Sequence, residues 1–272
     1  MSEQIAFIGG GNMASAIIQG LLRQGNAAPE TISVVEPWQE ARDRLRKQFG
    51  VLAQAAPGAF LAKAQTVVWA VKPQTFKEAA LPVGPHTQAA LHLSVAAGIP
   101  SDSIVRWLGN ERVVRSMPNT PALIGKGITA LYARPGIDAQ QKQGIERIIR
   151  STGDLLWMDD EDQLDAVTAL SGSGPAYVFF FLEAMTEAGQ QMGLSQQQAY
   201  QLAVATFAGA SELARSSDES PQVLRQRVTS KAGTTHAAIT SMEASHVGVA
   251  FQKAMLAARD RAREMGQEFG NS

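Results

Sequence analysis

Short apolar runs alternate with helical stretches through roughly the first 160 residues, and no other feature of the chain limits its fold as strongly. Most of the runs are continuously apolar, which is typical of strands covered on both faces. Such alternation predicts an α/β fold with a Rossmann-type, doubly wound, mainly parallel sheet. The runs predict strands at 4–9, 31–36, 66–71, 90–97, 112–117, 128–133 and 154–158. Helices are expected between them at about 13–24, 38–48, 73–80, 101–108 and 138–151.

From about residue 165 onwards the strand pattern stops and only helices are predicted. Two helix starts carry capping signals: Ser195 follows a stop at Gly193, and Ser220 precedes a proline at the first helical position. We therefore predict two domains, a Rossmann domain at 1–162 and an all-α domain at 163–272. The predicted helices of the second domain are at about 175–193, 195–215, 220–228, 235–243 and 246–267.

The first helix of the all-α domain is unusually apolar. Phe179, Phe180, Phe181 and Leu182 cover every side of it. A helix that is apolar all round must be covered all round. The residues leave two explanations open, a central core helix or a helix buried between two subunits.

Composition excludes several classes of function. The net charge of −1 gives no electrostatic support to a nucleic-acid or anionic-membrane partner. The chain has no cysteine, so disulfides, thiolate nucleophiles and cysteine-ligated metals are excluded. No histidine pair at helical spacing and no ligand-like cluster of carboxylates suggests another metal site. We expect no metal.

The N-terminal segment MSEQIAFIGGGNM is not typical of a signal peptide, because no basic region precedes its apolar run and glycines interrupt that run. No stretch approaches the ~18 uninterrupted apolar residues of a membrane span. The absence of cysteine fits a cytoplasmic protein. We expect a cytoplasmic location and no membrane association.

A glycine fingerprint follows the first predicted strand directly. Gly9, Gly11 and Ala14 match G-x-G-x-x-(G/A), with alanine in the third place. Gly9 permits a tight turn, Gly11 lets the backbone approach a pyrophosphate, and the helix that follows offers free N–H groups to the phosphates. Because the match lies between a strand and a helix, it indicates a dinucleotide-binding site.

The end of the second predicted strand bears on the choice between NADH and NADPH. Glu36 lies about 20 residues past the fingerprint, where a carboxylate can bond the ribose 2′-hydroxyl, and this favours NADH. Arg42 and Arg44 follow in the next helix and could turn towards a 2′-phosphate, although solvated helix charge explains them more simply. The residues leave the choice open.

Polar groups also stand at the ends of later strands, at the sheet edge where ligands of doubly wound folds lie. Lys72 follows the third strand in WAVKPQ and is either a ligand contact or a surface lysine. Asn119 lies between two prolines in SMPNTPAL, on a stiff loop that could place its amide beside a nicotinamide ring. Polar groups on rigid loops are good site candidates.

Proton-transfer groups are scarce for a dehydrogenase. An alcohol substrate needs a general base, yet none of the four histidines stands at a strand end with an acidic neighbour. His236 is the best candidate, and only because hydroxyl residues surround it. Such a site suits an electrophile that its own charge already activates. A protonated imine qualifies.

Six segments then resemble one family along essentially the whole chain. In order they are FIGGGNMA, AVKPQ, SVAAGI, MPNTPALIGKG, LSGSGPAY and VTSKAGTTHAAI. Together they resemble pyrroline-5-carboxylate reductase, the last enzyme of proline synthesis. The resemblance implies reduction of L-1-pyrroline-5-carboxylate to L-proline with hydride from NADPH or NADH. It also implies a Rossmann domain followed by an all-α dimerisation and substrate domain. That domain forms an intertwined homodimer, and many members assemble into pentamers of dimers.

The resemblance implies site residues as well. Asn119 is expected at the substrate, and Glu36 at the ribose as argued above. Glu161 corresponds to an acidic position near the cofactor, although this correspondence is the loosest. The other cofactor contacts implied are Ile8, Gly9, Gly10, Gly11, Asn12, Met13, Ala70, Val71, Lys72, Pro73, Ala96, Ala97 and Gly98.

The substrate carries a carboxylate, and the segment VTSKAGTTHAAI offers a neutral cradle for it. We expect Ser230 and the backbone of Gly233 and Thr234 to bind the carboxylate, and Thr235 to hydrogen-bond the ring nitrogen and assist its protonation. Simple N-capping of the helix at 235–243 is the alternative.

The segment departs from the family in one place. Many members have Pro-Gly-Gly where this chain has Lys231, Ala232 and Gly233, and alanine tolerates a positive φ less well than glycine.

Two other functions stay open. A related imine or 3-hydroxyacid reductase could share the two-domain plan. A hydroxyacid enzyme, however, wants a lysine near the cleft, and the helix at 175–193 has none. A nucleotide-binding sensor without turnover could keep the cleft, but the intact hydroxyl loop argues against loss of the substrate.

Overall fold

A computed structural model describes residues 3–270 of the chain. The chain divides into two compact units. The first contains residues up to Ser173 and also the C-terminal residues from Ala258, and the second is Gly174–Ala257.

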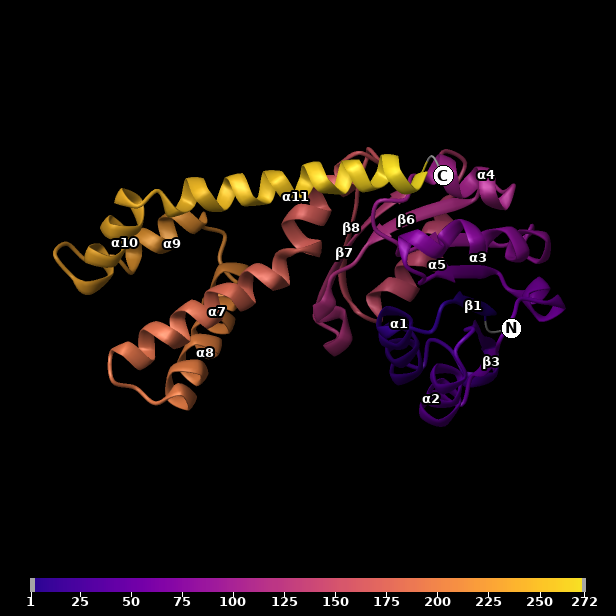
Figure 1. Ribbon diagram of the computed structural model, residues 1–272, viewed down its shortest axis with the longest axis horizontal. Helices are drawn as coiled ribbons and strands as arrows, with labels where there is room; N and C mark the ends of the chain where they lie inside the picture. The colour runs from indigo at the N-terminus through magenta and orange to yellow at the C-terminus, as the bar shows by residue number, and fades with distance from the viewer. Residues whose placement is uncertain (1–2, 271–272) are drawn as a thin grey trace. The chain divides into compact units, whose positions relative to one another are not determined.

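The first unit is built on one sheet of eight strands in the described residues, in the order β3-β2-β1-β4-β5-β6-β7-β8 (Figure 1). All neighbouring strands are parallel except β6 and β7, which are antiparallel. The order reverses between β1 and β4, which is the point where doubly wound sheets bind ligands. The strands are β1 Ile5–Ile8, β2 Ile32–Val35, β3 Leu52–Gln54, β4 Thr66–Trp69, β5 Leu91–Ser94, β6 Val113–Met117, β7 Gly127–Ala133 and β8 Gly153–Trp157.

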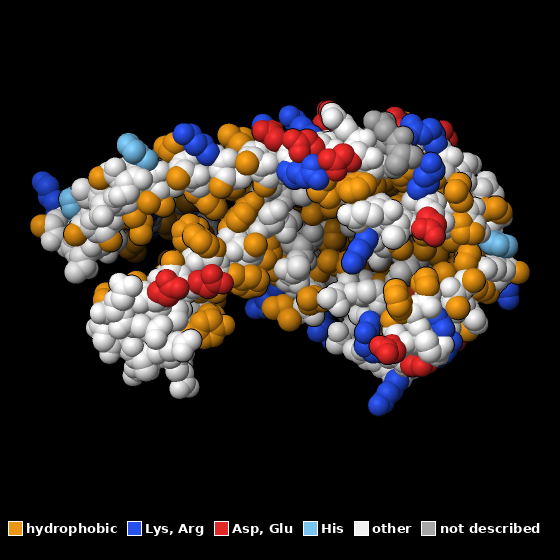
Figure 2. All heavy atoms as spheres, in the orientation of Figure 1, with side chains coloured by type: hydrophobic (Ala, Val, Ile, Leu, Met, Phe, Trp, Pro, Cys, Tyr) orange, Lys and Arg blue, Asp and Glu red, His pale blue; other side chains and the backbone are white. Residues whose placement is uncertain are grey.

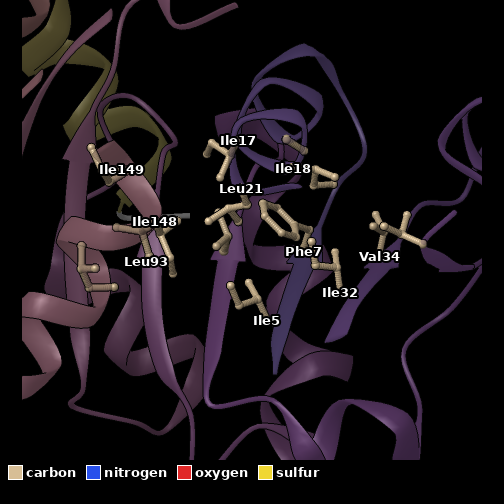
Figure 3. Packing of buried hydrophobic residues seen from close by; sticks show 14 of the residues in the cluster. Ile5, Phe7, Ile17, Ile18, Leu21, Ile32, Val34, Leu93, Ile148 and Ile149 are labelled. Atoms are coloured by element: carbon tan, nitrogen blue, oxygen red, sulfur yellow. The ribbon is translucent and has the colours of Figure 1, made fainter. Parts of the chain in front are cut away.

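Two apolar clusters sandwich this sheet. On β1, Ile5 and Phe7 belong to one cluster, whereas Ala6 and Ile8 belong to the other. This is the alternation of a strand buried on both faces. Figure 3 shows the first cluster, where side chains of α1 meet those of β1 and β2. The helices of this unit are α1 Asn12–Arg23, α2 Gln39–Phe49, α3 Phe76–Val83, α4 Ser101–Leu108, α5 Ala139–Arg150 and α6 Gln163–Val167.

The second unit is entirely helical in the described residues. Its helices are α7 Gly174–Gln191, α8 Gln196–Arg215, α9 Pro221–Arg227, α10 Thr234–Ala244 and the first part of α11 Val247–Gly270. The predicted caps are present: the hydroxyls of Ser195 and Ser220 accept hydrogen bonds from the backbone N–H groups of Gln198 and Val223. Gly193 has a φ of 96°, as a glycine stop requires.

The fold class is confirmed, a Rossmann-type sheet followed by an all-α part. Three details differ from the sequence analysis. The pattern missed β3, a strand of three residues in which only Ala53 is buried. It placed a helix at 73–80, whereas Pro73–Thr75 form a 3₁₀ turn and α3 begins at Phe76. It also did not reveal that β7 runs against β6.

The boundary between the two compact units lies between Ser173 and Gly174, later in the sequence than the domain boundary that we predicted after residue 162. Leu164 of α6 and Ala169 of the following π-helical turn, Thr168–Gly172, are buried in the first unit. At the far end of the chain, the last part of α11 returns to the first unit, where the carbonyl oxygen of Gly270 accepts a hydrogen bond of 2.7 Å from Ser103. The assignment of functional domains to 1–162 and 163–272 stays a prediction.

The α7 helix is not a core helix of a single chain. Phe179 and Phe180 are 58% and 66% exposed, and only Thr186 and Gly189 of this helix are buried. Figure 2 shows apolar side chains spread over the surface of the second unit. This exposure is what a helix buried between two subunits would show in a single chain, and that explanation stays a prediction.

Among the described residues, no helix is both long enough and apolar enough to cross a membrane. The same residues contain no group of three or more histidine and acidic side chains placed to hold a metal ion.

Candidate active site

The glycine turn after β1 has the conformation that the fingerprint requires. Gly9 has a φ of +93°, and its N–H donates to the carbonyl of Val35 over 2.8 Å. A Cβ at this position would lie 2.6 Å from the carbonyl oxygen of Ala70 at the end of β4. Only glycine is accommodated, because both the backbone angle and the neighbouring strand exclude a side chain. The turn therefore lies at the point where β1, β2 and β4 end together.

Gly11 is the open position of this turn. A Cβ there would meet no atom within 4 Å. Gly11 begins α1 without any side-chain cap, so the first N–H groups of that helix receive no side-chain acceptor. An exposed backbone at an uncapped helix start is suited to a pyrophosphate. Ala14 behind it is fully buried, which allows the helix to pack closely on the sheet. Ile8 to Met13 thus have the geometry expected of a phosphate-binding turn.

Glu36 at the end of β2 is buried and held by two backbone groups. Its Oε2 accepts from the N–H of Gly10 over 2.8 Å, and its Oε1 accepts from the N–H of Trp38 over 2.9 Å. The carboxylate is therefore fixed beside the glycine turn, where the 2′-hydroxyl of a ribose could donate to it.

Arg42 is not free to bind a 2′-phosphate in this conformation. It is buried, and it donates to the carbonyl oxygens of Glu36 and Pro37 over 2.8 and 2.5 Å. Arg44 reaches only the carbonyl of Gly10, over 3.4 Å. Arg42 is thus committed to the turn backbone, whereas Arg44 is exposed and makes only a long contact, so the choice between NADH and NADPH stays open.

Trp38 is a candidate that the sequence analysis missed. Its side chain is 77% exposed at the start of α2, two residues beyond Glu36. An exposed aromatic ring beside the ribose position could stack on the adenine. The signal was present in the sequence as an aromatic residue directly after Glu36 and Pro37, where a turn at the ligand edge of the sheet was expected.

The ends of β4 and β5 line the same edge of the sheet. Lys72 is exposed and starts the 3₁₀ turn, and its carbonyl accepts from the N–H of Thr75 over 3.0 Å. After β5, Ala96 and Gly98 are buried and Ala97 is half-buried. Gly98 has a φ of +75°. The predicted contacts of Ala70–Pro73 and Ala96–Gly98 with the cofactor stay predictions, but their positions at the carboxyl edge of the sheet are as expected.

Glu161 lies in a buried network instead of on an open surface. Its Oε1 accepts from the N–H of Ser101 and from Arg115, both over 2.6 Å, and its Oε2 accepts from the Ser101 hydroxyl over 2.5 Å. Partial burial raises the pKa of the neighbouring Tyr132, and the Glu161 charge adds to this shift. Because three donors already satisfy the carboxylate, this geometry supports a structural role. A direct contact with the cofactor stays a prediction.

Asn119 is also engaged within the first unit. Its Oδ1 accepts from the N–H of Ile128 over 3.0 Å, and its Nδ2 donates to the Ser171 hydroxyl over 3.2 Å. The side chain thus joins the start of β7 to the π-helical turn, which itself is a feature common near functional sites. One N–H of the amide is left for a ligand. Its role at the substrate stays a prediction.

The predicted substrate loop belongs to the second unit. Ala232 has a φ of 60°, so this alanine adopts the left-handed conformation for which the family's glycine is better suited. The N–H of Gly233 donates to the carbonyl of Ser230 over 3.0 Å. A Cβ on Gly233 would come within 2.5 Å of the Ser230 hydroxyl, which explains the glycine. The turn brings Ser230 next to the start of α10.

The hydroxyls of this loop do not cap the helix. Gly233 begins α10 without a side-chain cap, and the Ser230, Thr234 and Thr235 hydroxyls make no hydrogen bond with any residue from 3 to 270. Ser230 and Thr234 are exposed, and Thr235 is half-buried. The N-capping alternative is thus not what this structure contains. Free hydroxyls beside uncapped N–H groups are suited to an anion, and the role of this loop at the substrate stays a prediction.

Comparisons with known proteins agree with both halves of this description. Residues 161–265 match the family described as pyrroline-5-carboxylate reductase dimerisation. Residues 4–98 match the family described as NADP oxidoreductase, coenzyme F420-dependent.

Relatives cover almost the full length of the chain. It is 43% identical over 271 residues to pyrroline-5-carboxylate reductase of Pseudomonas aeruginosa, covering 99% of both chains. It is similar in structure to a pyrroline-5-carboxylate reductase from Coxiella burnetii, with a TM-score of 0.90, 38% identity, and 97% and 99% of the two chains covered. The corresponding reductase of Plasmodium falciparum, solved with NADP bound, has a TM-score of 0.87 at 26% identity and covers 97% and 98%.

Proposed function

The chain belongs to the pyrroline-5-carboxylate reductase family, and from this premise we propose that it reduces L-1-pyrroline-5-carboxylate to L-proline with NADPH or NADH. This is the last step of proline biosynthesis. The observation that carries the proposal is the uncapped start of α10 with three free hydroxyls around it. Such a group of donors suits a substrate that carries one carboxylate and one ring nitrogen.

The substrate loop supplies binding and orientation. Ser230 and the N–H groups at Gly233 and Thr234 bind the carboxylate, and Thr235 donates a hydrogen bond to the ring nitrogen. Asn119 is the further proposed substrate contact, through the amide N–H that its bonds to Ile128 and Ser171 leave over. A protonated imine accepts hydride at carbon without a strong acid or base, so the hydroxyl of Thr235 needs only to orient the nitrogen and assist its protonation.

The dinucleotide supplies the hydride when it is bound. Gly9, Gly10 and Gly11 and the start of α1 hold its pyrophosphate, and Glu36 accepts from the adenosine ribose. Glu36 is bonded to the backbone N–H groups of Gly10 and Trp38, and Arg42 is bonded to the carbonyl of Glu36; these bonds support NADH for this chain. A relative, however, has been solved with NADP bound. Both nucleotides belong in the first assay.

The match to a dimerisation family indicates self-association. We propose that two copies of the chain form a homodimer through the exposed face of α7. Two further features follow the family resemblance: assembly of such dimers into a pentamer of dimers, and a cytoplasmic location. On this proposal each active site needs both subunits, so a monomer is inactive.

The test is oxidation of the reduced nicotinamide, followed by its absorbance with pyrroline-5-carboxylate and each of NADPH and NADH. We expect rapid substrate-dependent oxidation by the wild type. In Thr235→Ala we expect kcat/KM to fall about a hundredfold, the scale of a lost proton-transfer group. Thr240→Ala is the matched control, because Thr240 is an exposed threonine of the same helix.

Other outcomes separate the alternatives. Full activity in Thr235→Ala would keep the reductase and reject the role of Thr235. No oxidation with either nucleotide, by a folded protein that binds nucleotide, would favour another imine substrate or a sensor. A sensor is then identified by its melting temperature, which should respond to nucleotide alone, whereas a reductase should respond to proline only when cofactor is present.

A further inference from the structure

The loop 95–100, which connects β5 to α4, carries three of the residues expected at the cofactor, and it is held at both ends. Its first residue, Val95, donates its N–H to the carbonyl of Trp69 over 3.0 Å. Before it, the carbonyl of Ser94 accepts from the Ser116 hydroxyl over 2.8 Å. The loop therefore leaves the sheet from a fixed position. The other end of the loop is held by a residue that is distant in the sequence, Glu161.

That other end is Ser101, the first residue of α4, and Glu161 holds it with both carboxylate oxygens. The two bonds from Ser101 to Glu161 measure 2.6 Å from its N–H and 2.5 Å from its hydroxyl. Ser101 is fully buried, and the residue before it, Pro100, cannot cap the helix with its own side chain. Glu161 thus acts as the N-terminal cap of α4, although it comes from the turn after β8.

The negative charge of Glu161 is stabilised from the sheet. Arg115 on β6 donates to it over 2.6 Å and is itself only 8% exposed. Arg134 donates to the Ser101 hydroxyl over 3.0 Å, which orients that hydroxyl towards Glu161. The Arg115 side chain is 9% exposed and that of Glu161 is 22% exposed, and removal of one partner from an ion pair so largely shielded from water is costly. The pair is therefore a rigid support for the end of the loop.

The middle of the loop is in contact with the last part of α11, which belongs to the same compact unit. A Cβ on Gly98 would lie 3.3 Å from the Cβ of Met265, and one on Gly266 would lie 3.0 Å from the carbonyl oxygen of Gly98. This contact limits movement away from the sheet. It does not fix the end at Ser101, which depends on Glu161.

We infer that Glu161 is a positioning residue for the cofactor: it holds Ser101 at the start of α4 and thereby sets the backbone of Ala96–Gly98 against the dinucleotide. It acts through Ser101 and does not itself touch the nucleotide. The inference rests on the proposed function, because it takes the loop 96–98 as part of the cofactor site.

The experiment compares three variants of the full-length protein. Glu161→Gln removes the charge with almost no change in shape. Ser101→Ala removes only the hydroxyl and keeps the backbone N–H, so it is the milder variant if the first does not fold. Glu212→Gln is the matched control, because Glu212 also accepts from an arginine, Arg215 over 2.5 Å, but its side chain is 64% exposed and, among the described residues, it makes no hydrogen bond with Ser101 or Glu161.

The dissociation constants of NADH and NADPH are measured by nucleotide fluorescence, and amide hydrogen exchange is followed by mass spectrometry. For Glu161→Gln we expect roughly tenfold weaker nucleotide binding, the scale of a lost hydrogen bond to a charged group, with the KM of pyrroline-5-carboxylate within about twofold. Exchange should accelerate in 95–101 and not in β1 or β2. Ser101→Ala should show the same pattern more weakly, and Glu212→Gln should match the wild type.

Three results would overturn the inference. Unchanged nucleotide affinity in both variants would remove the role of Glu161. Weaker nucleotide binding by Glu161→Gln, together with wild-type nucleotide binding by Ser101→Ala, would mean that Glu161 touches the nucleotide directly. Faster exchange throughout the first unit would reduce the effect to global stability. A wild type that binds nucleotide but does not turn over pyrroline-5-carboxylate would contradict the proposed function, and the nucleotide affinities and the exchange rates would still test the inference.

Discussion

Glu36 has two tasks at once. It orders the glycine turn through Gly10 and the start of α2 through Trp38, and it presents a carboxylate where a ribose is expected. A 2′-phosphate would have to approach this buried carboxylate without help from Arg42, which is bonded to backbone carbonyls. Like charges at close range are unfavourable, so the local chemistry disfavours NADPH. We therefore predict that Glu36 favours NADH, whereas the exposed Arg44 is the side chain that could still serve a 2′-phosphate.

His92 makes stability depend on pH. It is buried in β5, its Nδ1 accepts from the Trp69 indole over 3.0 Å, and burial lowers its pKa to about 4. An unfolded histidine binds protons below ~6.5. The unfolded state therefore gains protons first as pH falls, and the free energy of unfolding should drop by about 3 kcal/mol between pH 6.5 and 4, with no effect of His92 above that window.

Urea unfolding at fixed protein concentration from pH 7.5 to 4.5 measures this slope. His92→Gln, which keeps a hydrogen-bond acceptor for Trp69, should show a flatter pH dependence than the wild type. His236→Gln is the control, because His236 is exposed on α10. An equal slope in the wild type and His92→Gln would show that other groups cause the acid sensitivity.

At the scale of elements, some helix starts carry a side-chain cap and others do not; α2, α3, α4 and α6 have none from their N-cap residues either, and those N-cap residues are not glycine. The starts of α5, α8 and α9 carry side-chain caps from Asp138, Ser195 and Ser220. The starts of α1 and α10 have a glycine, Gly11 or Gly233, and no side-chain cap. A capped start satisfies some of its own N–H groups, whereas an uncapped one leaves them to water, to other residues or to a ligand. The two uncapped glycine starts are those proposed for the pyrophosphate and the substrate carboxylate.

The turn before α10 should tolerate glycine and reject a β-branched residue at position 232. Ala232 has a φ of 60°, where valine is strongly disfavoured and glycine is not. Ala232→Val should lower stability by about 1–2 kcal/mol and raise the KM of pyrroline-5-carboxylate, because the turn positions Ser230. Ala232→Gly should retain the wild-type KM.

Thermal unfolding and steady-state kinetics together test this pair. Ala237→Val is the control, since Ala237 is an exposed residue in the regular part of α10. If Ala232→Val has the KM of the wild type, the conformation of the turn does not matter for substrate binding.

At the scale of the whole molecule, the sequence of α7 makes sense only in an assembly. Large apolar side chains stay exposed on it in the single chain, Phe180 most of all at 66% among its phenylalanines. We expect Phe180→Glu to prevent dimer formation, because a charge would have to be buried without a partner. The variant should be monomeric, lack reductase activity and still bind nucleotide, since the Rossmann unit has its own core.

Light scattering after gel filtration gives the mass, and nucleotide fluorescence checks the remaining unit. Leu81→Glu is the control, because Leu81 is an exposed leucine of α3 in the first unit. A Phe180→Glu dimer with full activity would place the interface elsewhere.

Much of this architecture follows from local chemistry and was predictable from the sequence. Buried strands require apolar runs, helix ends require caps or glycine, and a phosphate turn requires Gly9 and Gly11. Each of these signals is contained in a few neighbouring residues. That is why β1, α1 and α4 lie close to the predicted ranges. The edge strand β3 was missed because a single buried alanine leaves no periodic signal.

Other features depend on residues that meet only after folding. Glu161 lies 60 positions from Ser101 and 46 from Arg115, so nothing local reveals that it caps α4. The end of α11 contacts Gly98 because the last residues of the chain return to the first unit, which also sets the limits of the compact units. Periodicity determines which face of an element is buried. Which distant side chain satisfies a buried polar group is decided by packing in three dimensions, because burial without a partner costs more than any local preference supplies.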